Sequence, residues 1–281
     1  VIAAIVSASR RRPPVRMLLA VAAAFLLSSA AATLNAFPSR MAAFSTAQPL
    51  PLQLAVLLGA SGVAVTLLAI AMAIIAAVVP GWSAPGAIRD RRTALVLALA
   101  VGAIGAASRL AGAIAGAQRD PSWPSYAGAG TYVPFLAASL APIAASLSRI
   151  VVILLIVAAA NRMTTFWTRR RALAGVLLFV IAGLLGASAP AQGVGAWIVS
   201  ATAAGGLFVA AYLLVLRHDL SLVPIAVAAM TVIGAVREGA MQAYGGALPG
   251  SMVGALAVAA IGYVWFAALR EPGPAVSTAA V

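Results

Sequence analysis

The sequence predicts an all-α polytopic membrane protein, a bundle of about eight transmembrane helices. Hydrophobic residues make up 64% of the 281 residues and charged residues only 8%, whereas soluble domains have about 45–50% apolar and about 25% charged residues. The apolar residues gather in stretches of about 20, the length that a helix needs to cross the hydrocarbon core. The connections between these stretches carry alternately many and few arginines.

Eight apolar segments are expected to cross the membrane. The first begins like a signal peptide, but its apolar run continues past the small residues, so we expect a retained helix. The second is long enough to require tilt. Pro142 removes a backbone donor from the fourth, so this helix is predicted to be broken there, with a plain kink as the alternative. The predicted spans are residues 17–37, 51–79, 93–117, 132–160, 172–189, 194–216, 222–244 and 251–269.

The basic residues predict the orientation. All 18 are arginine; thirteen lie in connections on one side, two on the other, and three within spans. Positive connections stay in the cytoplasm, so both termini are expected there. Residues 1–16 are interpreted as a basic cytoplasmic segment, 17–269 as one transmembrane domain and 270–281 as a short disordered cytoplasmic tail.

Composition limits the partners and cofactors. The formal charge is +13, but the arginines form no continuous basic face, so nucleic acid is not expected as a partner. The same charge suits the anionic lipids of the inner leaflet. With no Cys, one His and five acids, no metal or other cofactor is expected. The absence of Lys and the abundance of Ala, Gly and Arg indicate a GC-rich bacterial genome, and hence the bacterial cytoplasmic (inner) membrane.

The third span places an arginine among glycines. Arg109 shares one helix face with Gly102, Gly105, Gly112 and Gly116. Glycines let a neighbouring backbone approach closely, so Arg109 is expected to point into the bundle. Two interpretations remain open: an arginine bonded to nearby carbonyl groups in helix packing, or a functional arginine.

The fourth span has a polar face of its own. Ser139, Pro142, Ser146 and Arg149 are spaced three or four residues apart, which aligns them along one side of a helix. Broken helices at mid-membrane often frame substrate sites. This face is therefore a candidate ligand-binding surface.

The seventh span contains the pair Arg237-Glu238, with Gln242 on the face of Glu238. Glu238 is the one acid expected within the hydrocarbon. Its depth matches that of Arg109, so an ion pair between these two residues is a hypothesis that would ease the cost of burying either charge. Arg237 is expected to reach the outer interface.

The sequence Gly59-Ala60-Ser61-Gly62 resembles the GxSG motif of rhomboid intramembrane proteases. The single histidine, His218, is expected in a solvated inner turn, too far from Ser61 to act as its base. Close helix packing through the two glycines is therefore the preferred interpretation. Asp219 or Ser221 is expected to cap the helix that follows the turn.

The sequence Arg237-Glu238-Gly239-Ala240-Met241-Gln242 resembles a degraded form of the EExxxR motif of CPBP-type (CAAX-processing-like) intramembrane proteases. Arg237 replaces the first glutamate and Gln242 replaces the arginine. The resemblance implies an inactive or partial relative of that family.

Three functions are compatible with these features. The leading hypothesis is a permease or flippase for an anionic small molecule or lipid, and the sequence shows no catalytic set that would favour an enzyme. The first alternative is a non-catalytic scaffold that packs against a membrane-protein partner or a second copy through glycine-rich faces. The second is the inactive or partial CPBP-type relative. The candidate site consists of Arg109, Ser139, Ser146, Arg149, Arg237, Glu238 and Gln242.

Overall fold

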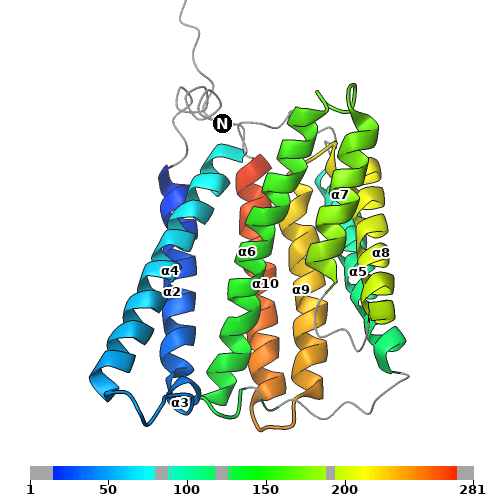
Figure 1. The fold of residues 1–281 in the computed structure, drawn as a ribbon. Helices are drawn as coiled ribbons and strands as arrows, with labels where there is room; N and C mark the ends of the chain where they lie inside the picture. The colour runs from blue at the N-terminus through cyan, green and yellow to red at the C-terminus, as the bar shows by residue number, and fades with distance from the viewer. Residues whose placement is uncertain are drawn as a thin grey trace, which may run out of the picture.

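The computed structural model describes residues 15–79, 88, 90–117, 126, 128–187 and 194–270, and gives the backbone alone for residues 15–18 and 108–117. Within these ranges every regular element is a helix, which confirms the predicted all-α class. The long helices run side by side, and the chain crosses from one end of the bundle to the other with each of them (Figure 1).

The helices follow the predicted apolar segments closely. In chain order they are α2 (Val15–Asn35), the short α3 (Phe37–Met41), α4 (Leu50–Val78), α5 (Arg91–Ala117), α6 (Pro134–Met163), α7 (Arg171–Gly186), α8 (Val194–Ala211), its π-helical continuation η2 (Tyr212–Leu216), α9 (Leu222–Met241) and α10 (Ala247–Arg270).

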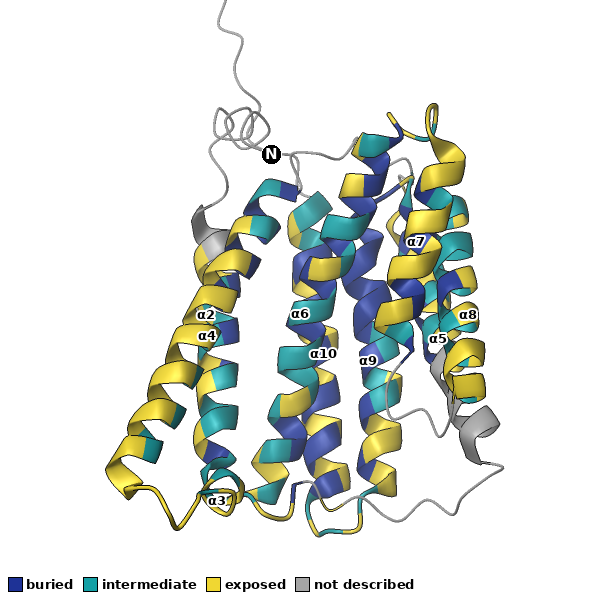
Figure 2. Cartoon of the chain, in the orientation of Figure 1, coloured by how far each residue is buried: buried dark blue, intermediate teal, exposed yellow. Residues whose placement is uncertain are grey.

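Five of the described helices are long and apolar enough to cross a membrane: α4, α6, α8 with η2, α9 and α10. α7 has 16 residues, which corresponds to about 24 Å, less than the hydrocarbon core of about 30 Å. The predicted number of eight spans is therefore not confirmed. Exposed residues cover much of the outside of the bundle (Figure 2), and many of them are large apolar side chains, as a lipid-facing surface requires. The chain is thus compatible with a multi-pass membrane protein.

Charged residues gather at one end of the bundle, which we call the arginine-rich end. It carries Arg91, Arg92, Arg169, Arg170 and Arg171 among the described residues, whereas Arg40 in α3 and Arg237 in the last turn of α9 lie towards the opposite end (Figure 1). The predicted sorting of arginines to one side therefore holds where the chain is described. The identity of that side as cytoplasmic stays a prediction.

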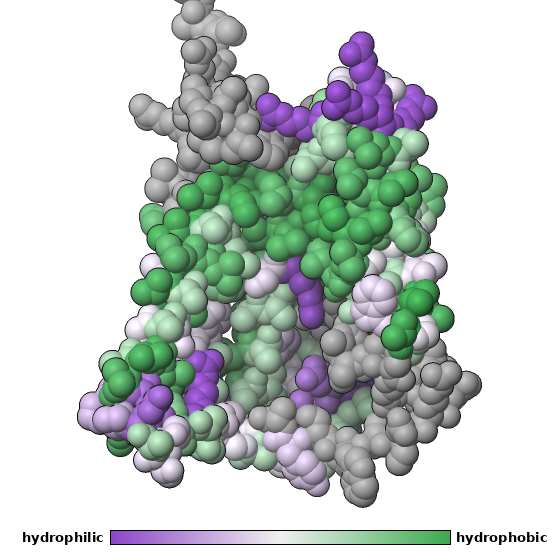
Figure 3. All heavy atoms as spheres, viewed as in Figure 1, coloured by the Kyte–Doolittle hydropathy of each residue, from purple (hydrophilic) through white to green (hydrophobic). Residues whose placement is uncertain are grey.

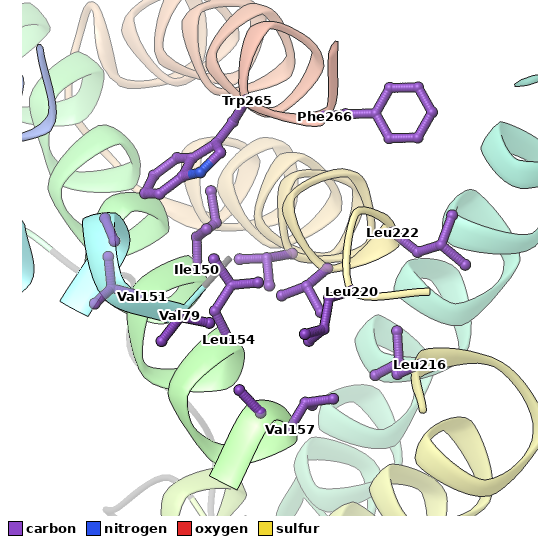
Figure 4. Packing of buried hydrophobic residues seen from close by; sticks show 14 of the residues in the cluster. Val79, Ile150, Val151, Leu154, Val157, Leu216, Leu220, Leu222, Trp265 and Phe266 are labelled. Carbon is purple, nitrogen blue, oxygen red and sulfur yellow. The ribbon is translucent and has the colours of Figure 1, made fainter. Parts of the chain in front are cut away.

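The hydrophobic core lies in the half of the bundle nearest the arginine-rich end. It joins the end of α4, the second half of α6, the start of α9 and the end of α10, and includes Val79, Leu154, Leu222 and Phe266 (Figure 4). α9 packs against α5, α6 and α10, and it is the most buried of the five membrane-length helices. On α4, by contrast, the buried residues all lie between Ala69 and Ala77. The first half of α4 is therefore poorly packed.

At the opposite end, an asparagine ties α2 to the start of α6. The side-chain amide N–H of Asn35 donates to the carbonyl oxygen of Val133 at 2.9 Å, and the backbone N–H of Val133 donates to Asn35 Oδ1 at 2.8 Å. The N–H of Tyr132 donates to the Asn35 carbonyl oxygen at 3.0 Å. These hydrogen bonds satisfy backbone polar groups near the membrane, where unpaired backbone groups are costly.

The predicted break in the fourth span is not confirmed. α6 is assigned as one helix from Pro134 to Met163, with Pro142 inside it. The reason lies in the neighbouring helix: Gly254 of α10 packs against the proline so closely that a Cβ there would lie 2.6 Å from Pro142 Cγ and 2.5 Å from the Ser139 carbonyl oxygen. Contact with a neighbouring helix stabilises the turn that a proline weakens.

Glycines make the close helix contacts, but only some of those predicted to do so. A Cβ on Gly102 of α5 would overlap the Ala226 carbonyl oxygen of α9, so this part of the predicted stripe packs as expected. Gly59 and Gly62 of α4 have no described atom within 4 Å of an added Cβ. The expected packing through these two glycines is therefore wrong among the described residues.

Asp90 immediately precedes α5, and its hydrogen bonds lead to a first prediction. Its carboxylate accepts hydrogen bonds from the backbone N–H groups of Arg92 (3.2 Å) and Thr93 (2.8 Å), and from the Thr93 hydroxyl. The bond from the Thr93 hydroxyl, followed by the backbone bonds, lowers the pKa of Asp90 below 3.8. A lowered pKa stabilises the fold above the ordinary value, and the stabilisation is lost as the pH falls through the lowered pKa.

We therefore expect Asp90→Ala to melt a few degrees below the wild type at neutral pH, and the two melting curves to converge below pH 3.8. Asp90→Asn keeps an acceptor but no charge, so its deficit should be smaller. The measurement is helical circular dichroism of the detergent-solubilised chain. A deficit for Asp90→Ala that persists unchanged in acid would contradict the role of the carboxylate.

Candidate functional site

The centre of the bundle holds an arginine. Arg149 stands midway along α6, and its Nη1 donates a long hydrogen bond of 3.5 Å to the hydroxyl of Thr231 at the middle of α9. Thr231 is buried and Arg149 is half-buried. A guanidinium group is thus held at mid-depth, between the two helices that carry most of the predicted site.

Two serines of the predicted polar face lie on the same helix. Ser146, one turn before Arg149, is fully buried, and its hydroxyl has no hydrogen-bond partner among the described residues. Ser139 is also buried, but its hydroxyl donates to the Phe135 carbonyl oxygen at 2.8 Å. Ser139 is therefore satisfied within α6, whereas Ser146 retains the capacity to bind another group.

The surface of the bundle is not uniformly apolar. Figure 3 shows a broad hydrophobic band in the half towards the arginine-rich end. Below that band, hydrophilic atoms interrupt the surface at mid-height between α6 and α9, and the molecule is hollowed towards the opposite end (Figure 3). The hydrophobic core fills the other half of the bundle, which leaves the half with the hollow less tightly packed.

The acidic part of the predicted site lies nearer the opposite end. Glu238 and Arg237 are exposed in the last turn of α9. Gln242 Nε2 donates to Glu238 Oε1 at 3.4 Å, and Gln242 Oε1 is buried with no partner among the described residues. Seven residues separate Thr231 from Glu238, about 10 Å along the helix. The predicted site residues are therefore divided between two depths.

Tyr244 lies at the same end of the bundle, just after α9. The Tyr244 hydroxyl packs directly on Gly128, where a Cβ would overlap it. Burial raises the pKa of Tyr244, and the negative charge of Glu238 raises it further. Tyr244 therefore stays neutral and can donate a hydrogen bond at this end of α9.

Arg109 lies on α5, but its side chain is outside the described residues. The hypothesis of an ion pair between Arg109 and Glu238 therefore stays a prediction.

Sequence reasoning missed an ion pair at the arginine-rich end. Arg270, expected in a disordered tail, is the last residue of α10, and its Nη2 lies 2.6 Å from Asp219 Oδ2. The same guanidinium donates to the Ile88 carbonyl oxygen at 2.8 Å and the Ser221 hydroxyl at 3.0 Å. Asp219 Oδ1 in turn accepts the backbone N–H of Ser221, the residue before α9, and the side chain of Ser221 does not cap the helix, so the predicted capping of α9 is not confirmed. His218 is exposed, as expected.

A second unpredicted contact joins α3 to α4. Arg40 Nη1 donates to the Ser61 hydroxyl at 3.2 Å. Arg40 was expected in a polar connection, and Ser61 in a packed glycine motif. No signal in the sequence links the two, because the link depends on how the connection folds back along α4.

The arrangement as a whole suits the binding of an anion. Guanidinium groups and hydroxyl groups donate hydrogen bonds to carboxylates and phosphates, and such charge-assisted bonds are stronger than neutral ones. Within the described ranges, no three His, Cys, Asp or Glu side chains lie close enough together to hold a metal ion.

The resemblance to CPBP-type proteases covers only residues 237–242, which the structure places at the exposed end of α9. Comparison of the chain with models of protein families, with curated proteins and with solved structures finds no match.

Proposed function

We propose that the protein is a permease or flippase for an anionic small molecule or lipid, with Arg149 as the central contact. The observation that supports this proposal is the guanidinium group at mid-depth, hydrogen-bonded to Thr231 and one turn from the buried hydroxyl of Ser146. The substrate would bind Arg149 through its phosphate or carboxylate group.

The energetic argument rests on charge. An arginine at the middle of a bilayer costs about 3 kcal/mol or more, so such residues face the bundle interior or a hydrated cavity and mark transport paths. The predicted spans hold three arginines and one glutamate. An anion that binds Arg149 reduces this positive excess.

The remaining predicted residues have secondary roles in this proposal. Arg237, Glu238 and Gln242 stand at the end of α9, where the path would open. Arg109 would line the path from α5. Ser139, being bonded to its own helix, supports α6 and does not contact the substrate.

The scaffold hypothesis is less well supported. It depends on glycine faces that dock a partner, but Gly102 and Gly254 pack against α9 and α6 of the same chain. These two glycines are explained without a second protein, whereas Gly59 and Gly62 of α4 face open space among the described residues.

Replacing Arg149 with Gln tests the proposal. We expect transport to fall by about tenfold or more, because a hydrogen bond to a charged group contributes about 1.5–3 kcal/mol. Purified protein is reconstituted in phosphatidylcholine vesicles, and movement of fluorescent phosphatidylglycerol between leaflets is followed by dithionite quenching. A parallel assay follows inorganic phosphate efflux, which separates a lipid from a soluble anion.

Arg171→Gln is the matched control, since it removes the same charge from an exposed position at the arginine-rich end. It should transport as the wild type does. If Arg149→Gln folds and moves both probes at the wild-type rate, the proposal is wrong.

A further inference from the structure

We propose that Arg40 and Ser61 form a binding site for the phosphate group of an anionic lipid, on the lipid-exposed half of α4. This site would select the substrate before it reaches Arg149; that role rests on the proposed function, whereas binding itself does not. The site thus specifies the substrate class as an anionic phospholipid.

The direction of Arg40 is the first observation. Arginines near the ends of membrane helices usually extend their charge towards water. Arg40 instead reaches Ser61, which stands eleven residues after the first residue of α4. That spacing corresponds to about 16 Å along the helix. The guanidinium group therefore contacts α4 well inside the length of that helix.

Unused hydrogen-bonding capacity is the second observation. Within the described residues the one salt bridge joins Arg270 and Asp219, so no described carboxylate pairs with Arg40. Its one described side-chain bond uses a single N–H of the five that a guanidinium group carries. Ser61 accepts that bond through its oxygen, which leaves its own O–H to donate. A phosphate group, with several acceptor oxygens, matches this pair.

The open surface beside Ser61 is the third observation. Ser61 is half-buried, and at Gly62, the next residue of the helix, no described atom lies within 4 Å of an added Cβ. Leu58, one turn before Ser61, is an exposed apolar side chain, and most residues of this half of α4 are exposed (Figure 2). A charged donor pair within an apolar, open surface favours an amphiphile over a free anion, because acyl chains cover the apolar part.

Native mass spectrometry of the full, detergent-solubilised chain tests the site by titration with dioleoyl phosphatidylglycerol. We expect Arg40→Gln to weaken binding about tenfold and Ser61→Ala to weaken it less. Gly62→Val should also weaken binding while leaving the melting temperature unchanged, since its side chain enters open space.

The matched controls are Arg171→Gln, which removes an exposed arginine, and Gly206→Val, which also meets no described atom within 4 Å. Both should bind as the wild type does. Wild-type affinity in Arg40→Gln and Gly62→Val would overturn the proposal. Displacement of the lipid by an equal concentration of inorganic phosphate would overturn the assignment of a lipid.

The experiments can contradict either proposal without contradicting the other. If Arg149→Gln transports normally but Arg40→Gln still loses lipid, the transport proposal is wrong and the lipid site stands. If Arg149→Gln stops transport but Arg40→Gln binds lipid normally, the lipid site is wrong and the central contact stands.

Discussion

Replacing Asp219 with Ala is expected to lower the free energy of unfolding by about 3 kcal/mol, because removing one partner of a buried ion pair leaves the other charge uncompensated. Asp219 is 2% exposed and Arg270 20% exposed. The substitution also removes the acceptor of the Ser221 backbone N–H and hydroxyl at the start of α9. Three segments meet at Arg270, namely the end of α10, the start of α9 and the segment before α5, and the substitution removes the carboxylate that holds its guanidinium group in place.

A double-mutant cycle separates the ion pair from other effects. Arg270→Met removes the guanidinium group while keeping a long side chain over Phe266, which Arg270 now covers at 4.8 Å from the ring centroid. Because no charge is then left unpaired, the double variant should be less destabilised than the sum of the two single variants. The measurement is denaturation in mixed micelles followed by circular dichroism. Additive losses would show that the pair contributes little.

Gly254→Val is expected to cost about 3 kcal/mol or to prevent folding, because small-to-large changes in packed positions force the backbone apart. A Cβ at residue 254 would lie 2.5 Å from the Ser139 carbonyl oxygen. That oxygen belongs to the backbone of α6 next to Pro142, so it cannot move aside as a flexible side chain would. Relief requires α10 to separate from α6.

Gly206→Val is the control, because it places the same side chain on α8 in open space. It should leave the melting temperature of the solubilised protein within about a degree of the wild type, as surface changes usually cost under about 0.5 kcal/mol. Equal stability of Gly254→Val and Gly206→Val would show that α6 and α10 do not pack closely at this point.

The helix positions were readable from the sequence. The segments predicted at 51–79 and 194–216 agree within one residue with α4 and with α8 and η2. Each such helix is defined by its own apolar length and by the charged or turn-forming residues that bound it, and both are local properties of the chain.

The binding role of the predicted site residues stays a prediction, and the sequence anticipated only part of their contacts. The face of α6 was predicted correctly as a row of polar residues, but the sequence did not indicate that Ser139 would bond to its own helix or that Arg149 would meet Thr231. Helix periodicity places residues on a face; it does not say which helix that face contacts.

By itself, the sequence determined the helical class, the places where helices lie and the side on which most described arginines gather, because apolar length and charge act residue by residue. Only the tertiary structure decided that α6 continues through Pro142, that Arg270 pairs with Asp219 and that Arg40 reaches Ser61. Each of these depends on a neighbour far away in the chain: the backbone of α10 against a proline, a turn against a helix end, and a short helix folded back along α4.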